Sequence, residues 1–254
     1  MKDLVFIGDV HLDRDDEALA DFVVFLQSLA GRVSCVVLMG DLFNLWLGHE
    51  AMEQAHHRAV IAALVALRVQ GVRVVYLEGN RDYRVGPRHR GTTFDISDEA
   101  PWTETFGGRR LYAVHGHGLN PDDLSYRRWH RFSRLSPVWG LFHLFPVATR
   151  IRWSDAMERR LRKSNRRFKG TLPEELLLGI AADRWDAGDT DVVLGHFHVE
   201  RRFEVAGRGR LWVLPEWKGS RRHLRLTADG EMGFVDSMSV PRSPSSNSSS
   251  TPSA

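Results

Sequence analysis

The sequence predicts an α/β fold, because apolar runs of strand length alternate with helical patterns. The runs at residues 4–8, 33–40 and 72–78 are short, rich in Val, Ile and Leu, and followed by turn residues. Between them, residues 15–30 and 49–70 have apolar residues at helical spacing. Strands separated by helices of this length favour a mostly parallel sheet, in which the carboxyl ends of the strands lie close together.

The second half of the chain continues with strands. Two more apolar runs, at 110–114 and 191–194, repeat the first arrangement. After them the pattern changes to short runs separated by Gly-rich turns, which predict an antiparallel second sheet. These runs cover residues 201–205, 210–214, 223–227 and 231–235.

Length and composition favour one elaborated domain, over residues 1–236. The 254 residues are 43% hydrophobic, enough for one sizeable core. Residues 237–254 are Ser/Pro-rich and too poor in large apolar residues to offset the entropy of ordering, so we expect a disordered tail. The single cysteine, Cys35, lies in an apolar run, where we expect a small buried hydrophobe and no disulfide within the chain.

The amino terminus and the apolar segments bear on location. The first apolar stretch is short, is broken by Gly8 and Asp9, and is followed by no cleavage-site pattern. The amino terminus therefore does not resemble a signal peptide. No apolar segment approaches the roughly 20 residues of a membrane-spanning helix. We therefore expect a cytoplasmic protein whose contact with a membrane, if any, is peripheral.

Candidate metal ligands recur where apolar runs end. They form five groups with the patterns D-x-H, G-D, G-N-R-D, H-G and G-H-x-H. Carboxylate, imidazole and amide donors of this kind hold divalent cations when chain segments bring them together. The candidates are Asp9, His11, Asp41, Asn80, His115, His196 and His198.

Each group alone has a simpler interpretation. Asp9 and Asp41 can cap helices, Asn80 can belong to a turn, and a lone His is often buried and hydrogen-bonded. The five groups in this order resemble the calcineurin-like metallophosphoesterase family. That resemblance implies a four-layered α/β/β/α sandwich. It also implies two divalent cations, with Mn²⁺ the expected metal.

The resemblance also implies residue roles. One cation is expected on Asp9, His11, Asp41 and His198, and the other on Asp41, Asn80, His115 and His196. Asp41 would bridge the two, and Asp41, Asn80 and His115 would be catalytic. Two cations about 3.5 to 4 Å apart can hold a shared water, lower its pKa and neutralise phosphate oxygens. No Ser or Cys nucleophile is then required.

Two residues beside these groups have open roles. Arg81 can contact a phosphate oxygen through its planar guanidinium, or form a salt bridge with Asp82. His117 matches no ligand position, so it either supports the ligands or is solvated, and we favour solvation.

A basic, aromatic segment follows His115. Residues 127–169 contain thirteen Lys and Arg against two acids, in a chain whose net charge is +3. Such asymmetry indicates an anionic partner. The apolar and aromatic residues between Trp129 and Phe145 favour a lipid boundary or an acyl-chain groove over a helical pair that packs on the domain. Nucleic acid is disfavoured, since these aromatics cluster and are not interleaved with basic residues.

A narrower resemblance rests on further residues. The stretches 40–48 and 79–86, the pair at 122–123 with Tyr126, and a closing V-L with Trp217 are similar to the family of UDP-2,3-diacylglucosamine pyrophosphatases of lipid A biosynthesis. This resemblance implies a helical lid at about 122–170, association with the inner membrane surface, and release of UMP and 2,3-diacylglucosamine 1-phosphate. The implied substrate contacts are Asn80, Arg81, Tyr126, Arg162, Ser164 and Asn165.

Departures from the family leave the substrate open. His117 stands where Asp is usual, Asn44 where Glu is usual, and Val199-Glu200 where Arg-Pro is usual. None of these positions is an implied ligand. A related phosphoesterase acting on a nucleotide, a cyclic nucleotide or another phosphodiester is the alternative. A scaffold without activity is a second one, although it would be expected to lack several ligands.

Overall fold

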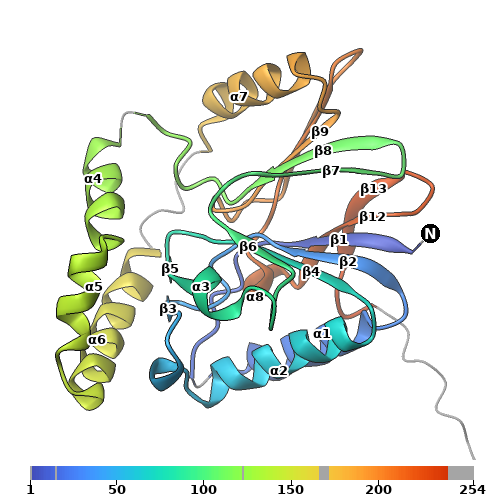
Figure 1. Cartoon of the computed structure of the whole chain (residues 1–254). Coiled ribbons are helices and arrows are strands. Elements are labelled where there is room, and N and C mark those ends of the chain that lie inside the picture. The colour runs from blue at the N-terminus through green and yellow to red at the C-terminus, as the bar shows by residue number, and fades with distance from the viewer. Residues whose placement is uncertain (1, 15, 122, 166–171, 240–254) are drawn as a thin grey trace, which may run out of the picture.

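The molecule is built in four layers, with two sheets face to face and helices on both outer faces (Figure 1). The structure, a computed structural model, describes residues 2–14, 16–121, 123–165 and 172–239; for residues 125 and 161–165 it describes the backbone alone. α1 (Ala18–Ser28) and α2 (Ala55–Val69) cover the first sheet, and α7 (Glu174–Asp186) covers the second. The expected four-layered α/β/β/α sandwich is confirmed.

The first sheet has six strands in the order β13-β12-β1-β2-β4-β6. β1, β2, β4 and β6 are parallel, with Phe6 beside Val37 and Val37 beside Val75. β12 and β13 extend the sheet antiparallel from the free edge of β1. The strands are β1 (Asp3–Ile7), β2 (Val33–Leu38), β4 (Arg73–Leu77), β6 (Ile96–Asp98), β12 (Arg222–Leu226) and β13 (Met232–Asp236).

The second sheet has five strands in the order β10-β11-β9-β8-β7. β8, β9 and β11 are parallel, whereas the edge strands β7 and β10 are antiparallel to their neighbours. The strands are β7 (Trp102–Phe106), β8 (Arg109–Val114), β9 (Asp191–Leu194), β10 (Arg201–Val205) and β11 (Gly209–Val213). A further two-stranded parallel pair joins β3 (Trp46–Leu47) to β5 (Asp82–Tyr83).

The expected grouping of the late strands was wrong. The four runs after His198 do not form one antiparallel sheet, since β10 and β11 join the second sheet while β12 and β13 join the first. Alternating apolar residues identify a strand but not its partner. Here β12 pairs with β1 because Leu224 and Leu226 enter the same apolar layer as Leu4 and Phe6.

Three apolar layers fill the spaces between these four. Side chains from both sheets meet in the middle, among them Phe6, Val37, Ala113, Val193 and Trp212, all at most 1% exposed. Separate layers lie between α1, α2 and the first sheet, and between α7 and the second sheet. Because the strands are packed on both faces, their ends are held in place. The loops that follow the strands are therefore held in place as well.

The expected helices are confirmed with shorter bounds. The pattern over residues 15–30 becomes α1, and that over 49–70 divides into a 3₁₀ turn, η1 (Glu50–Met52), and α2. Cys35 is 6% exposed, as expected, and burial raises the pKa of its thiol to about 12, which excludes it as a nucleophile. Short helices α3 (Val85–His89) and α8 (Trp217–Ser220) complete the body.

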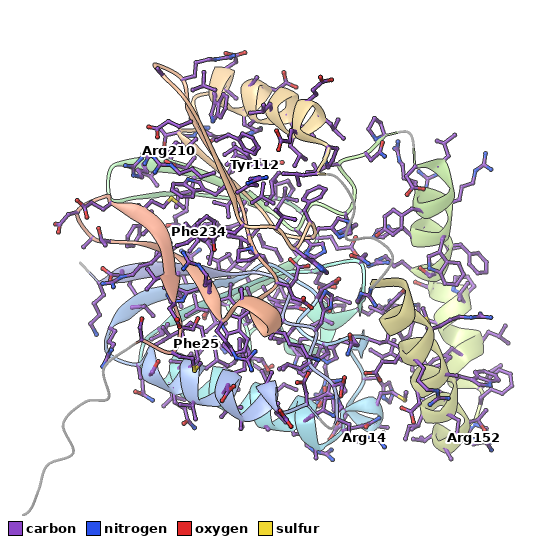
Figure 2. All side chains as sticks on the ribbon, turned by 180° about the vertical axis from the view of Figure 1, so that it is seen from behind. Arg14, Phe25, Tyr112, Arg152, Arg210 and Phe234 are labelled. Carbon is purple, nitrogen blue, oxygen red and sulfur yellow. The ribbon has the colours of Figure 1, made fainter. Side chains whose placement is uncertain are left out.

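Three helices lie beside the ends of the sheets, where a helical lid was expected, and are called the lid below (Figure 1). They are α4 (Leu124–Ser133), α5 (Ser136–His143) and α6 (Val147–Asn165). An apolar cluster that includes Trp139 of the lid and Leu45 and Tyr83 of the body joins the two. Figure 2, the view from behind, places Phe25 in the layer of α1 and Arg152 on the lid, away from the sheets.

The chain is still packed at Ser237, where the tail was expected to begin. The side chain is 3% exposed and its hydroxyl oxygen accepts a hydrogen bond of 2.9 Å from Trp217 Nε1. Residues 240–254 lie outside the described residues.

Candidate active site

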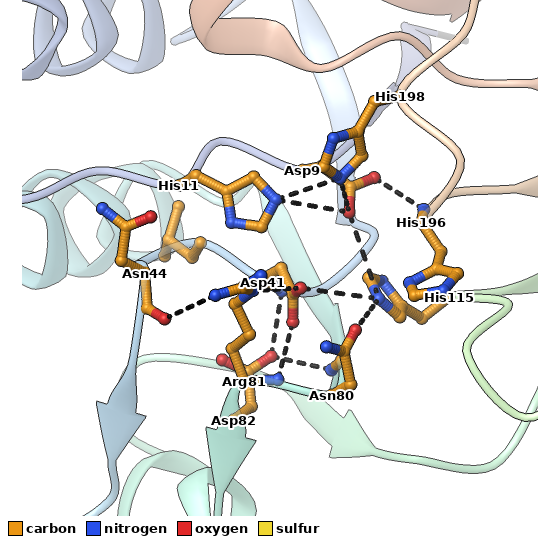
Figure 3. A network of polar contacts seen from close by, with 12 residues as sticks. Asp9, His11, Asp41, Asn44, Asn80, Arg81, Asp82, His115, His196 and His198 are labelled. Carbon is orange, nitrogen blue, oxygen red and sulfur yellow. Dashed lines mark hydrogen bonds and ion pairs between the residues drawn. The ribbon is translucent and has the colours of Figure 1, made fainter. Parts of the chain in front are cut away.

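Seven side chains meet where strands of both sheets end (Figure 3). Asp9 and His11 follow β1, Asp41 follows β2 and Asn80 follows β4. The second sheet contributes His115 after β8, and His196 and His198 after β9. The structure therefore brings together all seven candidate ligands.

The backbone around these side chains is held in an unusual conformation. Seven non-glycine residues in the described part of the chain have positive φ, and five of them are candidate ligands. Non-glycine residues avoid this region, and such strain concentrates at functional sites. The five are Asp9, His11, Asp41, His196 and His198.

Glycine allows the loops to approach each other closely. A Cβ atom on Gly79 would lie 2.2 Å from Oδ1 of Asp41, and a Cβ on Gly40 would lie 2.8 Å from Nδ1 of His115. Both glycines belong to the G-D and G-N-R-D patterns. They are needed because any side chain there would separate the ligand-bearing loops.

The first group of donors surrounds Oδ1 of Asp9. This atom lies 3.4 Å from Nε2 of His198 and 3.9 Å from Nε2 of His11, and the two imidazole nitrogens are 3.1 Å apart. The other carboxylate oxygen, Oδ2, accepts a 2.7 Å hydrogen bond from the backbone N–H of His196, which fixes the carboxylate. Oδ1 is buried and has no hydrogen-bond partner among the described residues.

The second group surrounds Nε2 of His115. Nδ1 of this ring donates to the carbonyl oxygen of Met39, so in a neutral ring Nε2 carries a lone pair. That lone pair faces three acceptors, Oδ1 of Asn80 at 3.2 Å, Oδ2 of Asp41 at 3.8 Å and Oδ1 of Asp9 at 4.0 Å. Acceptors without a donor between them repel, and a cation removes that repulsion.

The donor set fits divalent cations. Asp9, His11 and His198 offer atoms within 4.8 Å of one another, and so do Asp9, Asp41 and His115. Imidazole nitrogens mixed with carboxylate oxygens suit Mn²⁺ or Zn²⁺. Asp9 belongs to both groups, so in the structure it lies as centrally as Asp41, for which the bridging role was expected.

Burial and neighbouring charge set the protonation of these groups. Burial raises the pKa of Asp9, but His198 and His115 lower it by more, so the carboxylate stays ionised. Burial lowers the pKa of His11 well below its usual value and that of His196 to about 3. These rings are therefore neutral and able to ligate a cation near pH 7.

Arg81 lies inside the site, with its side chain 6% exposed. Its Nε is 3.4 Å from Oδ2 of Asp41, and its backbone N–H donates to Oδ1 of the same carboxylate at 2.9 Å. Burial raises the pKa of Asp41, and the charges of His115 and Arg81 reduce this shift. The guanidinium therefore lies beside the candidate metal ligands.

Asp82 is a functional residue whose role the sequence did not indicate. Its buried Oδ2 accepts hydrogen bonds from Tyr76 Oη at 2.7 Å and from the backbone N–H groups of Gly79 and Asp41 at 2.7 and 3.0 Å. These bonds join the loop after β2 to the loop after β4. Its position in G-N-R-D was the available signal, but a salt bridge with Arg81 was the role considered there.

His117 and Tyr126 lie at the mouth of the site. The ring of His117 is 5.2 Å from that of His115 and 5.8 Å from that of Tyr126, and burial is the main cause that lowers its pKa to about 2. The solvated interpretation of His117 was therefore wrong. The hydroxyl of Tyr126 is buried and has no hydrogen-bond partner in the described part of the chain, which leaves it free for a ligand. The side chains of the other expected lid contacts, Arg162, Ser164 and Asn165, lie outside the described part of the structure.

Comparison with known proteins agrees with this geometry. The chain is 27% identical to a protein named UDP-2,3-diacylglucosamine hydrolase from Sodalis glossinidius, over 90% of this chain and 95% of the relative. It is 31% identical to the protein of that name from Ralstonia nicotianae, over 84% and 82%, and 32% identical to that from Azotobacter vinelandii, over 89% and 94%.

The family model described as calcineurin-like phosphoesterase matches residues 3–214, a range that contains all seven candidate ligands. The two loops joined by Asp82 and the donors around Asp9 and His115 fall inside this match. The chain therefore belongs to the calcineurin-like phosphoesterase family, and its site is that of a metal-dependent hydrolase of phosphate esters.

Proposed function

We propose that the protein hydrolyses the pyrophosphate bond of UDP-2,3-diacylglucosamine, releasing UMP and 2,3-diacylglucosamine 1-phosphate, with two Mn²⁺ ions. The observation that carries the proposal is an apolar cavity between the lid and the body, next to the metal-ligand loops. The names of the relatives support the same substrate.

The cavity has a volume of about 200 Å³ and is lined almost entirely by apolar side chains. Leu45, Leu47 and Tyr83 line it from the body, and the lid supplies the remaining walls. A concave apolar site of this kind suits an acyl chain, since burying each methylene contributes about 0.8 kcal/mol. The lid residues are Trp129, Phe132, Ser133, Val138, Trp139, Phe142, Trp153, Ser154 and Met157.

The cavity and the metal-ligand loops share the strand β5. Tyr83 in the cavity wall directly follows Asp82, which organises the ligand loops. Arg134 of the lid lies over the ring of Tyr83 at 4.9 Å and donates to the carbonyl oxygens of Gly79 and Asp82 at 3.3 and 2.9 Å. An acyl chain in the cavity would therefore have one end close to the groups that are proposed to hold the phosphates.

The chain's own residues then have distinct tasks. Asp9, His11, Asp41, Asn80, His115, His196 and His198 would hold the cations. Two such cations supply Lewis acidity and a water with a lowered pKa. Arg81 lies where its guanidinium can pair with a phosphate oxygen as negative charge develops. Asp82 holds together the loops that carry Asp41 and Asn80. Tyr126 can form a hydrogen bond with the sugar or with a phosphate.

The lid also fits a peripheral contact with the inner membrane surface, on the cytoplasmic side. Among the described residues, thirteen large hydrophobic side chains are exposed, and nine of them lie between Leu124 and Trp153. Exposed apolar groups on helices that also bear arginine suit a lipid boundary with anionic headgroups. None of the helices that the structure describes is long and apolar enough to cross a membrane.

A product assay tests the proposed function. Purified protein loaded with Mn²⁺ is incubated with UDP-2,3-diacylglucosamine, and mass spectrometry measures UMP and the lipid phosphate. We expect both products, and we expect EDTA or Asp41→Ala to remove them. If no UMP forms while a generic phosphodiester is cleaved in a metal-dependent way, the chemistry stands and the substrate is wrong.

A further inference from the structure

A third group of possible metal ligands lies between the lid and the body, outside the seven residues above. It consists of Glu99 from the turn between β6 and β7, His117 from the loop after β8, and His130 from α4. One ligand atom of each lies within 4.8 Å of the others. Three segments far apart in the sequence therefore converge on one point.

The spacing is close to that of a tetrahedral site. Two ligands of a tetrahedral zinc ion lie about 3.4 Å apart when each bond is about 2.1 Å. Nε2 of His130 lies 3.3 Å from Oε2 of Glu99, and the ring centroids of His117 and His130 are 5.2 Å apart. The ligand atom of His117 lies within 4.8 Å of the other two, so each of these separations exceeds the tetrahedral spacing by about 1.4 Å at most.

One buried nitrogen of each ring has no hydrogen bond that meets the usual geometry. Nδ1 of His117 and Nε2 of His130 are both buried and have no hydrogen-bond partner among the residues that the structure describes. The contact of His130 with the body is its ion pair with Glu99, 3.3 Å from Nε2 to Oε2. Buried polar atoms without partners are costly, and a cation would satisfy them.

Arg134 orients the carboxylate of this cluster. Its Nε donates to Oε1 of Glu99, which leaves Oε2 directed at His130. Metal-ligating carboxylates are commonly hydrogen-bonded in this way on their other oxygen. The positive charge of Arg134 opposes a cation nearby, but its Nη2 donates to the carbonyl oxygens of Gly79 and Asp82 in the body.

We propose that Glu99, His117 and His130 bind a third divalent transition-metal ion, of which Zn²⁺ is the best match, and that this ion fixes the lid helix α4 to the body. Two imidazoles and one carboxylate leave one coordination position for water. Tyr126 lies one turn before His130, and its ring is 5.6 Å from that of His130. The ion would therefore also hold Tyr126 over the active site.

Metal stoichiometry tests this proposal on the full-length protein. The chain is stripped with a chelator and dialysed against Co²⁺, and metal per chain is measured with the visible spectrum. We expect three ions per wild-type chain, one with the intense bands of four-coordinate Co²⁺. His130→Gln should bind two ions and lose those bands. The control His143→Gln, which changes a lid histidine beside His49, should still bind three.

Two further measurements keep the outcome clear. Glu99→Gln removes the ligand on the body side and should also lower the count by one, should His130→Gln fold poorly. Asp41→Asn weakens the two catalytic positions, yet the four-coordinate bands should remain, which separates this site from the proposed function. Anomalous scattering from a Zn²⁺-soaked wild-type crystal should give a peak between His117 and His130. A count of two in wild type, with no such peak, would overturn the proposal.

Discussion

The body and the lid form the two walls of the proposed active site, and they are built differently. The body wall consists of buried ligands, such as Asp9 and Asp41, on loops whose backbone is strained and tied together by Asp82. The lid wall consists of aromatic and aliphatic side chains that line the apolar cavity and remain partly exposed to solvent, among them Trp129 at 49% and Phe132 at 53%. A preorganised wall suits chemistry, whereas an apolar wall suits selection and binding of a lipid substrate.

The largest effect should come from the body wall. Asp41→Asn removes a carboxylate ligand, and we expect kcat to fall about a thousandfold or more, since loss of a cation removes several kcal/mol of transition-state stabilisation. The raised pKa of Asp41 means that its charge destabilises the metal-free fold. The variant should therefore unfold in urea with EDTA at the same or a higher midpoint than wild type. A thousandfold loss with a lower midpoint would show that the fold, and not the ligand, had failed.

The support of the body wall gives the next effect. Asp82→Asn should reduce Mn²⁺ affinity or activity by roughly 10 to 100-fold, because supporting partners of ligands contribute on that scale. A titration of activity with Mn²⁺ measures it. Asp186→Asn, which changes an exposed carboxylate paired with Arg208 on α7, is the matched control and should behave as wild type. If both variants showed the same dependence of activity on Mn²⁺, Asp82 would not support the metal ligands.

Burial in the body also makes its stability depend on pH. Burial, aided by Arg225, lowers the pKa of His223 to about 4 from an ordinary 6.5. The unfolded chain takes up the proton first, so stability is complete above pH 6.5 and is lost as pH falls toward 4. The loss between pH 7.5 and pH 5 is about 2 kcal/mol. Urea unfolding of metal-free His223→Asn should show a correspondingly smaller loss over this range, and an identical pH dependence would contradict the assignment.

The smallest effect concerns the outer face of the lid. Replacing Leu141 and Leu144 together by Ser should weaken binding to vesicles of anionic phospholipid by roughly tenfold, since the two partly inserted leucines together contribute on the order of 1 to 2 kcal/mol. Cosedimentation measures this. The matched control replaces Val24 and Val69, which are exposed on α1 and α2 at 57% and 82%, and should bind as wild type does. Equal loss in both pairs would mean that the lid is not the membrane-facing surface.

The body was more predictable from sequence than the lid. The Val-rich runs of β1, β2 and β4 are buried on both faces, so composition alone predicted them, and the ligands follow because each ends its strand. The strand β7 was missed because its alternation, from Trp102 to Phe106, is interrupted by polar residues on a half-exposed edge. The partner of β12 was mistaken because pairing depends on which apolar layer a strand enters.

The candidate site was also predicted only in part from the sequence. Type and spacing predicted which side chains meet, but not that Asp9 would lie as centrally as Asp41, or that His117 would pack against Tyr126 and His130. Those contacts depend on how the loops and the lid pack, and neighbouring positions in the sequence contain no signal for them. For the lid, the sequence indicated an apolar, basic segment, while the cavity lined by Trp139 and Tyr83 required the fold.

We propose that the body performs the hydrolysis and that the lid selects an acylated substrate. The most direct measurement compares kcat/KM for UDP-2,3-diacylglucosamine with that for UDP-N-acetylglucosamine, in wild type and in Trp139→Ala. We expect wild type to prefer the diacylated substrate at least a hundredfold, and we expect the variant to lose most of that preference while it cleaves a small phosphodiester normally. Equal kcat/KM for the two UDP-sugars in wild type would show that the lid does not select the acylated substrate.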